Sequence, residues 1–140
     1  MNLEPQWIVG FCDGEACFHI SINRNATTSL GYQVLPEFVV TQHSRDIQVL
    51  YALKEFFGSG VVRHSSGKNK GSSVMCFRMR DSRELRAKLI PFFEKYSLKT
   101  TKNINFLKFR DVLLMMEQKK HLTEEGLEKI REIRAAMIPD

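Results

Sequence analysis

The 140-residue sequence lacks any apolar run that approaches the roughly 18 residues needed to span a bilayer, so no transmembrane segment is expected. Cysteine is scarce as well. Cys12, Cys17 and Cys76 form no Cys-x-x-Cys motif and are odd in number, which argues against a disulfide framework and favours a reducing compartment. The four histidines do not have the spacing of a zinc site.

The first ten residues, MNLEPQWIVG, lack the basic and Arg/Ser-rich patterns of targeting segments. We therefore expect the protein to act where it is made, in an organelle that encodes it (a chloroplast or mitochondrion) or in a prokaryotic cytoplasm. With 43% hydrophobic residues the chain is not of the disordered class, and its length fits a single domain over residues 1–140.

The net charge of +5 and the pI of about 9.2 permit a nucleic-acid partner without requiring one. The distribution of charge is more informative. Between Val61 and Arg80 there is no acidic residue, and the basic residues there are Arg63, Lys68, Lys70, Arg78 and Arg80. Such a segment is either a solvated hairpin or part of a nucleic-acid surface.

Two pairs of strands and several helices are predicted from periodicity and from capping residues. Apolar residues alternate with polar ones from Phe18 to Asn23 and again from Met75 to Arg80. Pro36, inside the second strand, favours a bulge or an edge position. The expected elements are a helix over 5–14, strands over 18–23 and 32–42, a helix capped by Ser44 and ended by Gly58, strands over 61–65 and 73–80, a helix opened by Asp81, a helix over 101–117 and a last helix from Thr123.

This order, αββαββα with further C-terminal helices, predicts an α+β domain whose four-stranded antiparallel sheet carries helices on one face. The other face would then expose the polar and basic positions of the strands. It could be simply solvated, or it could bind nucleic acid, since a β-ribbon fits the major groove of DNA. The face lacks the interleaved aromatic residues of a single-strand stacking platform, which favours duplex DNA.

The segment from Trp7 to Phe18 carries the candidate chemistry. Gly10 and Gly14 fall on one helical face and would let a second helix approach closely. Asp13 and Glu15 follow at the end of this helix, where a carboxylate is disfavoured unless a cation balances its charge. Mg²⁺ prefers carboxylate, carbonyl and water oxygens and acts on phosphates with only one or two protein carboxylates.

Residues 8–16, IVGFCDGEA, resemble the LAGLIDADG motif of homing endonucleases, with Ala16 in place of the closing glycine. The segments LGYQVLPEFVVTQ, PFFEKYSLKTTK and HLTEEGL are also similar to the single-motif branch of that family, so the resemblance covers nearly the whole chain. It implies the αββαββα LAGLIDADG fold and an intron-encoded, site-specific nuclease that makes a double-strand break in a long pseudo-palindromic DNA site.

The resemblance also implies roles for individual residues. Glu15 and the carbonyl of Gly14 would bind Mg²⁺, for which Mn²⁺ or Ca²⁺ can substitute in binding, while Asp13 would be a structural residue at the helix end. Because one motif supplies one glutamate, we expect a C₂ homodimer in which each subunit reads half of the site. Its interface would contain Trp7, Gly10, Phe11, Asp13 and Gly14.

Three further positions match family residues near the reacting phosphate. Gln42 would order water, and Lys99, with Lys102 as a second lysine, would lie near the scissile phosphate. A further basic position of the family aligns with Asp46, where Arg45 could substitute. The candidate DNA contacts are the outward strand positions and the tip of the second hairpin: His19, Ser21, Asn23, Gln33, Glu37, Arg63, Lys68, Lys70, Cys76, Arg78 and Arg80.

Two other functions share this fold. An intron maturase would act as an RNA-splicing cofactor, and a DNA-binding regulator would carry a degenerate motif. Retention of Glu15, Gln42 and Lys99 argues against the regulator, whereas the replacement of the motif glycine by Ala16 is compatible with it. We expect that Ala16 does not abolish metal binding, because the acid beside it is intact and alanine is the smallest change from glycine.

Overall fold

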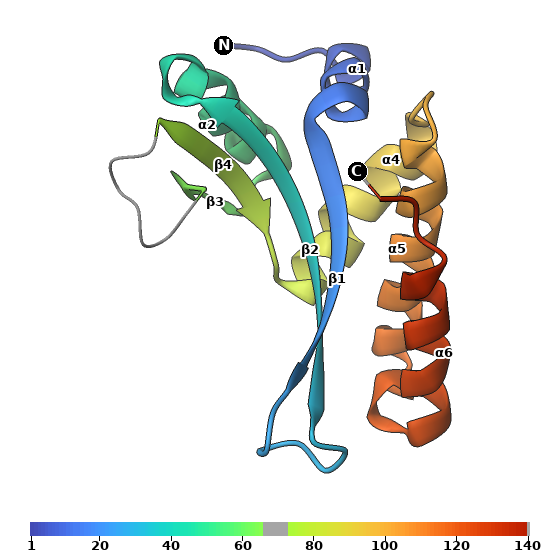
Figure 1. The fold of residues 1–140 in the computed structure, drawn as a ribbon. Coiled ribbons are helices and arrows are strands. Elements are labelled where there is room, and N and C mark those ends of the chain that lie inside the picture. The colour runs from blue at the N-terminus through green and yellow to red at the C-terminus, as the bar shows by residue number, and fades with distance from the viewer. Residues whose placement is uncertain (66–72, 140) are drawn as a thin grey trace.

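The computed structural model describes residues 1–65 and 73–139 (Figure 1). The helices and strands are α1 (Pro5–Glu15), β1 (Ala16–Arg24), β2 (Tyr32–His43), α2 (Ile47–Phe57), β3 (Val61–His64), β4 (Val74–Met79), α3 (Ser82–Glu84), α4 (Ile90–Lys95), α5 (Lys102–Glu117) and α6 (Glu124–Ala135). Two 3₁₀ turns, η1 (Ser44–Asp46) and η3 (Lys120–Leu122), precede α2 and α6, and a π-helical turn, η2 (Leu85–Leu89), joins α3 to α4.

The four strands form one antiparallel sheet in the order β1-β2-β4-β3. Ala16 at the start of β1 lies opposite Val40 of β2, which in turn lies opposite Phe77 of β4. The end of α1 is therefore level with the middle of β4, while the β1–β2 hairpin extends well beyond the other two strands (Figure 1). The predicted fold class and element order are confirmed.

A cluster of phenylalanines joins the helices to one face of the sheet. Phe18 of β1 contacts the rings of Phe106 and Phe109 on α5 at 5.5 and 5.3 Å. Its register partner on β2, Phe38, contacts Phe57 of α2 and Phe93 of α4. Because paired residues share a face of the sheet, α2, α4 and α5 all cover the same face, and burying these rings is a large part of what stabilises the fold.

The uncertainty over Pro36 is resolved by the sheet register. Pro36 pairs with Ile20 of β1 without an interruption, so the strand has no bulge there. Pairing of β2 with β4 begins only at Phe38, and Pro36 therefore has a strand on one side alone. A residue without an amide hydrogen is tolerated at such a locally unpaired edge, as predicted.

The start of the second helix differs from the prediction. Ser44 is not the cap; instead His43 precedes the 3₁₀ turn η1, and its ring Nδ1 accepts a hydrogen bond from the amide of Arg45 at 3.0 Å. The end of this helix is as expected, because Gly58 adopts a left-handed φ of 67°. Gly60 also has a positive φ, and a Cβ there would lie 2.5 Å from the ring of Phe77.

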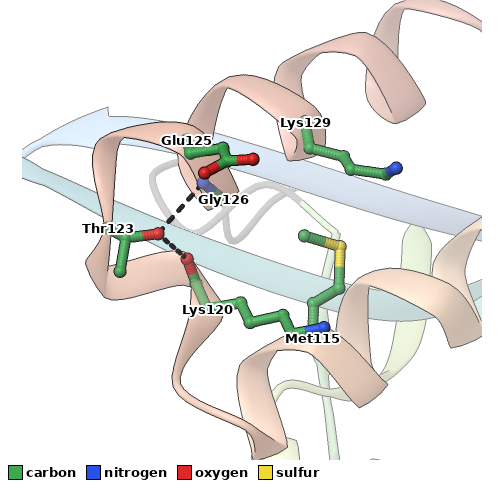
Figure 2. A pocket seen from close by; sticks show the side chains of 6 residues that line it. All are labelled: Met115, Lys120, Thr123, Glu125, Gly126 and Lys129. Carbon is green, nitrogen blue, oxygen red and sulfur yellow. Dashed lines mark hydrogen bonds between the residues drawn. The ribbon is translucent and has the colours of Figure 1, made fainter.

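The predicted caps of the later helices are confirmed. Asp81 accepts hydrogen bonds from the amides of Arg83 and Glu84 at 2.9 and 3.2 Å. Thr123 accepts one from the amide of Gly126 at 3.0 Å and donates to the Lys120 carbonyl, as Figure 2 shows beside the pocket at the start of α6. The π-helical turn η2 was not predicted.

Among the described residues, no helix combines the length and the apolar character that crossing a membrane requires.

Candidate active site and nucleic-acid interface

Helix α1 buries one side and exposes the other. Ile8, Val9 and Cys12 lie in the core, whereas Trp7, Gly10 and Gly14 are exposed. A Cβ built at either glycine meets nothing within 4 Å, so none of the described residues lies against these two positions of the helix. We call the exposed strip formed by Trp7, Gly10, Phe11 and Gly14 the small-residue face of α1. The rings of Trp7 and Phe11 stack on it with centroids 4.8 Å apart.

Asp13 ties the end of α1 to the loop that precedes α5. One carboxylate oxygen accepts the amide hydrogen of Lys99 at 2.8 Å, and the other accepts from the amide and the hydroxyl of Thr100 at 3.1 and 2.8 Å. Partial burial by itself would raise the pKa of Asp13. The hydrogen bonds from Lys99 and Thr100 and the positive charge of Lys99 outweigh burial, and the pKa is lowered. Asp13 is thus a structural helix-end residue within its own chain.

The two candidate lysines occupy the same region. Lys99 Nζ donates to the Ser97 carbonyl at 2.7 Å, and Lys102 Nζ donates to the Ala16 carbonyl. Lys102 also lowers the pKa of the Cys12 thiol, but burial dominates and raises it to about 12, so Cys12 stays neutral. The junction of α1 with β1 and the loop before α5 therefore form one hydrogen-bonded unit.

Glu15, the last residue of α1, is exposed, and so is Gly14 before it. The carbonyl of Gly14 is among the last four of the helix, which have no intrahelical partner. A carboxylate and a carbonyl of this kind are the oxygen ligands that Mg²⁺ takes, so the residues fit that ion. The described residues contain no group of three or more His, Cys, Asp or Glu side chains that could hold a metal, so the fit rests on this one carboxylate and carbonyl.

Ala16, where the motif departs from its pattern, does not disturb this arrangement. Its backbone is extended, with φ −88° and ψ 157°, a conformation that requires no glycine. The residue is 2% exposed and belongs to the hydrophobic core. The substitution therefore leaves the surroundings of Glu15 open.

Gln42 lies at the same end of the sheet as Glu15, because Ala16 pairs with Val40, two residues before Gln42. Its own partner on β4 is Met75, and its side chain is half-buried. Arg45 and Asp46, which follow in η1, are both exposed and form a loose ion pair at 4.0 Å. The structure thus gathers Glu15, Gln42, Lys99 and Lys102 at one end of the sheet.

The uncovered face of the sheet carries the predicted strand positions. The register places His19 opposite Glu37 and Asn23 opposite Gln33, while Val39 pairs with Arg78. Most of these side chains are exposed or half-buried: His19, Ser21, Asn23, Gln33, Glu37, Arg63, Arg78 and Arg80. The predicted hairpin-tip contacts, Lys68 and Lys70, lie outside the described residues.

Cys76 is an exception among the predicted contacts. It shares this face by register with Thr41 and Arg63, yet its residue is only 3% exposed. Burial raises the pKa of its thiol, although the neighbouring arginines Arg78 and Arg63 oppose that shift. We therefore correct its assignment, because a neutral, covered thiol offers no surface for a base contact.

A family model described as LAGLIDADG endonuclease matches residues 8–113. The chain belongs to the LAGLIDADG endonuclease family. Among solved structures it is similar to the homing endonuclease I-TnaI, with 52% identity and a TM-score of 0.93 over 99% of this chain and 90% of that one. The meganuclease I-SmaMI bound to uncleaveable DNA is 37% identical with a TM-score of 0.92, over 99% of this chain and 45% of that one.

Curated members of the LAGLIDADG family are longer than this chain. "Probable intron-encoded endonuclease 2" of Neurospora crassa is 32% identical over 133 residues, which are 95% of this chain and 27% of that protein. "DNA endonuclease I-CeuI" of Chlamydomonas moewusii is 40% identical over 90 residues, which are 64% of this chain and 40% of that protein. The chain thus spans between a quarter and two fifths of their length.

Two polar links on the sheet of this LAGLIDADG protein were not predicted. Arg80 Nε lies 2.5 Å from a carboxylate oxygen of Glu37, and Asn25 donates its side-chain amide to that of Gln33 at 3.1 Å. Arg80 and Glu37 are 43 residues apart, and Asn25 and Gln33 are 8 residues apart across the first hairpin. Both pairs depend on strand register, which alternation alone does not define. The expected strand over 18–23 ends before Asn25, so this residue was not among the predicted contacts.

Proposed function

We propose that the chain is one subunit of a homodimeric, Mg²⁺-dependent endonuclease that cuts both strands of a specific, pseudo-palindromic DNA site. The observation that carries this proposal is the exposed Glu15 at the end of the open small-residue face of α1. Membership of the LAGLIDADG endonuclease family indicates DNA cleavage as the reaction. The exposed face of α1 supports a dimer in which two Glu15 residues could act together.

The small-residue face supports the proposed homodimer. The exposed Trp7 and the half-buried Phe11 lie beside two glycines and form an apolar strip that a second α1 can cover, and small residues let the two helix axes come close. A twofold axis along this contact brings the two Glu15 residues together. The remaining interface residue, Asp13, would contribute through the loop that it holds.

Duplex DNA is the proposed substrate. The uncovered sheet face presents arginine, histidine, asparagine and glutamine side chains, which are donors suited to base edges in the major groove. Two relatives with the same fold have structures with DNA: I-SmaMI is bound to uncleaveable DNA, and I-LtrWI is bound to target DNA. With two subunits, each sheet would read one half-site.

The proposed chemistry is hydrolysis of one phosphodiester bond in each strand. Mg²⁺, when bound, would stabilise the attacking and leaving oxygens of an in-line displacement. Glu15 and the Gly14 carbonyl would hold it. Gln42 would orient the attacking water, and Lys99 and Lys102 would balance the negative charge that develops on the phosphate.

Relatives named as intron-encoded endonucleases support an origin within an intron, and we extend this to an organelle genome for this chain. The natural substrate would then be the host gene without the intron, because the inserted intron divides the site.

The test uses the purified protein and a duplex that spans the uninterrupted host sequence. We expect binding in Ca²⁺, and a double-strand break in Mg²⁺ or Mn²⁺. Binding in Mg²⁺ with no cleavage would refute the endonuclease and favour a regulator. Tight binding of the intron RNA, with no binding to the duplex, would favour a maturase instead.

A further inference from the structure

Arg80 and Glu37 form an ion pair on the uncovered sheet face. Arg80 follows directly after β4, and since Met79 pairs with Phe38, it lies beside Glu37 of β2. Arg80 Nε is 2.5 Å from the Glu37 carboxylate. The Arg80 side chain is 56% exposed and that of Glu37 only 21%. The carboxylate is thus the inner partner, and the guanidinium lies toward solvent.

The atoms of this contact determine what Arg80 can still bind. A guanidinium carries five N–H donors in a rigid plane, and the carboxylate engages the one on Nε. The contact uses Nε, so it leaves the donors on the two terminal nitrogens for a second partner. Arginine with this geometry matches the O6 and N7 acceptors of guanine, which is the commonest specific contact in the major groove.

Glu37 is better explained as a positioning residue than as a base contact. A glutamate that reads DNA accepts a hydrogen bond from the cytosine amino group. Here the carboxylate oxygen is already paired with Arg80, and the side chain is mostly covered. Restricting a long arginine side chain to one orientation before binding lowers the entropy that binding costs. The predicted base contact of Glu37 is thereby replaced by an indirect role.

The sheet register gives the location of the pair. Glu37 lies opposite His19, four residues along β1 from Glu15. At about 3.3 Å per residue this is about 13 Å from the end of α1 along the strand. A base read from this row would lie within a few base pairs of the bond that Glu15 is proposed to cut.

We propose that Arg80, oriented by Glu37, specifies a guanine in each half-site, close to the cleavage position. This inference rests on the proposed function. It names the base that is read and the two residues involved, on a sheet face whose DNA contacts are otherwise proposed only from its residue types.

The test selects bound duplexes from a random library in Ca²⁺, with the wild type, Arg80→Gln, Arg80→Lys and Glu37→Gln. Glu94→Gln is the matched control, because it disrupts a glutamate–arginine pair, with Arg110 at 3.6 Å, on α4 and away from the sheet. Thermal melts confirm that each variant is folded, and Arg80→Lys retains the charge while removing the planar fork.

We expect the wild type to prefer guanine at one position of each half-site by about 5- to 150-fold. Both Arg80 variants should lose most of that preference, Glu37→Gln should reduce it several-fold, and Glu94→Gln should keep it. All other positions should be unchanged.

Three results would overturn the inference. Full guanine preference in the Arg80 variants would exclude the base contact, and full preference in Glu37→Gln would exclude the positioning role. An equal loss at every position would indicate a structural role. If instead the wild type enriches no sequence at all, the proposed function fails together with this inference.

Discussion

The Asp13 carboxylate accepts the amide hydrogen of Lys99 at 2.8 Å, although the two residues are 86 positions apart in the chain. This hydrogen bond therefore joins the motif helix α1 to the backbone of Lys99, a candidate catalytic lysine. Asp13 and Glu15, two residues apart, thus have different roles: the first is engaged inside its own chain, and the second faces outward.

Replacing Asp13 should weaken the fold at this contact. Asp13→Ala removes the acceptor of three hydrogen bonds and leaves the amides of Lys99 and Thr100 without it. We expect the free energy of unfolding to fall by about 1–3 kcal/mol, measured by urea denaturation at low protein concentration. Asp111→Ala, which removes an exposed carboxylate paired with Arg110, is the control and should change it by less than about 0.5 kcal/mol. Equal effects would contradict the assigned role.

The same contact predicts a pH dependence. Because the pKa of Asp13 is lowered on folding, its ionised form stabilises the protein above the unfolded-state pKa, and this contribution is lost as the pH falls through the folded-state pKa. The stability difference between the wild type and Asp13→Asn should therefore be largest near neutral pH and shrink in acid. Denaturation at several pH values measures it, and a constant difference would show that the charge of Asp13 is not involved.

A substitution at Gly10 tests dimer formation separately from folding. A Cβ at Gly10 meets none of the described residues within 4 Å, so we expect Gly10→Leu to keep the fold and to gain about 0.5–1 kcal/mol of helix propensity. The same side chain should block a second α1. We expect Gly10→Leu to sediment as a folded monomer, with a melting temperature that does not depend on protein concentration.

Gly126 is the matched glycine for that experiment. It also lies in a helix, but a Cβ there would overlap the Lys120 carbonyl at the turn shown in Figure 2. Gly126→Ala should therefore lower the melting temperature without changing the association state. A Gly10→Leu protein that remains a dimer would exclude the small-residue face as the interface.

Restoring the motif glycine should not improve catalysis. Since Ala16 is buried and has extended backbone, Ala16→Gly should leave the cleavage rate within about twofold and cost about 1 kcal/mol of stability. Cleavage assays beside thermal melts measure both. A large gain in rate would show that the alanine impairs the site.

Much of the fold could be predicted because alternation and capping are local. The alternation after Phe18 located β1, and Asp81 and Thr123 located helix starts, because each cap binds amides two or three residues away. His43 was missed because a histidine ring is not a usual cap, and Ser44 beside it is one. The π-helical turn η2 precedes Pro91, and no local signal distinguishes it from an ordinary helix.

The candidate site residues could be proposed from the sequence, but most of their contacts could not. Glu15 and the two glycines lie on one helix, and the spacing of four predicted that Gly10 and Gly14 share a face. The anchoring of Asp13 and the pairing of Glu37 with Arg80 join distant segments, so they required the register and the loop path. Cys76 alternated correctly, but only the packed side chains around it reveal that it is covered.

The central claim is that Glu15 supplies the carboxylate for cleavage, and it is tested most directly by Glu15→Gln, which keeps the shape of the side chain and removes its charge. The wild type and the variant are compared on the same duplex, for binding in Ca²⁺ and for cleavage in Mg²⁺. We expect binding within a few-fold of the wild type and a loss of cleavage of about a hundredfold or more. A Glu15→Gln protein that cuts both strands at the wild-type rate would contradict the account.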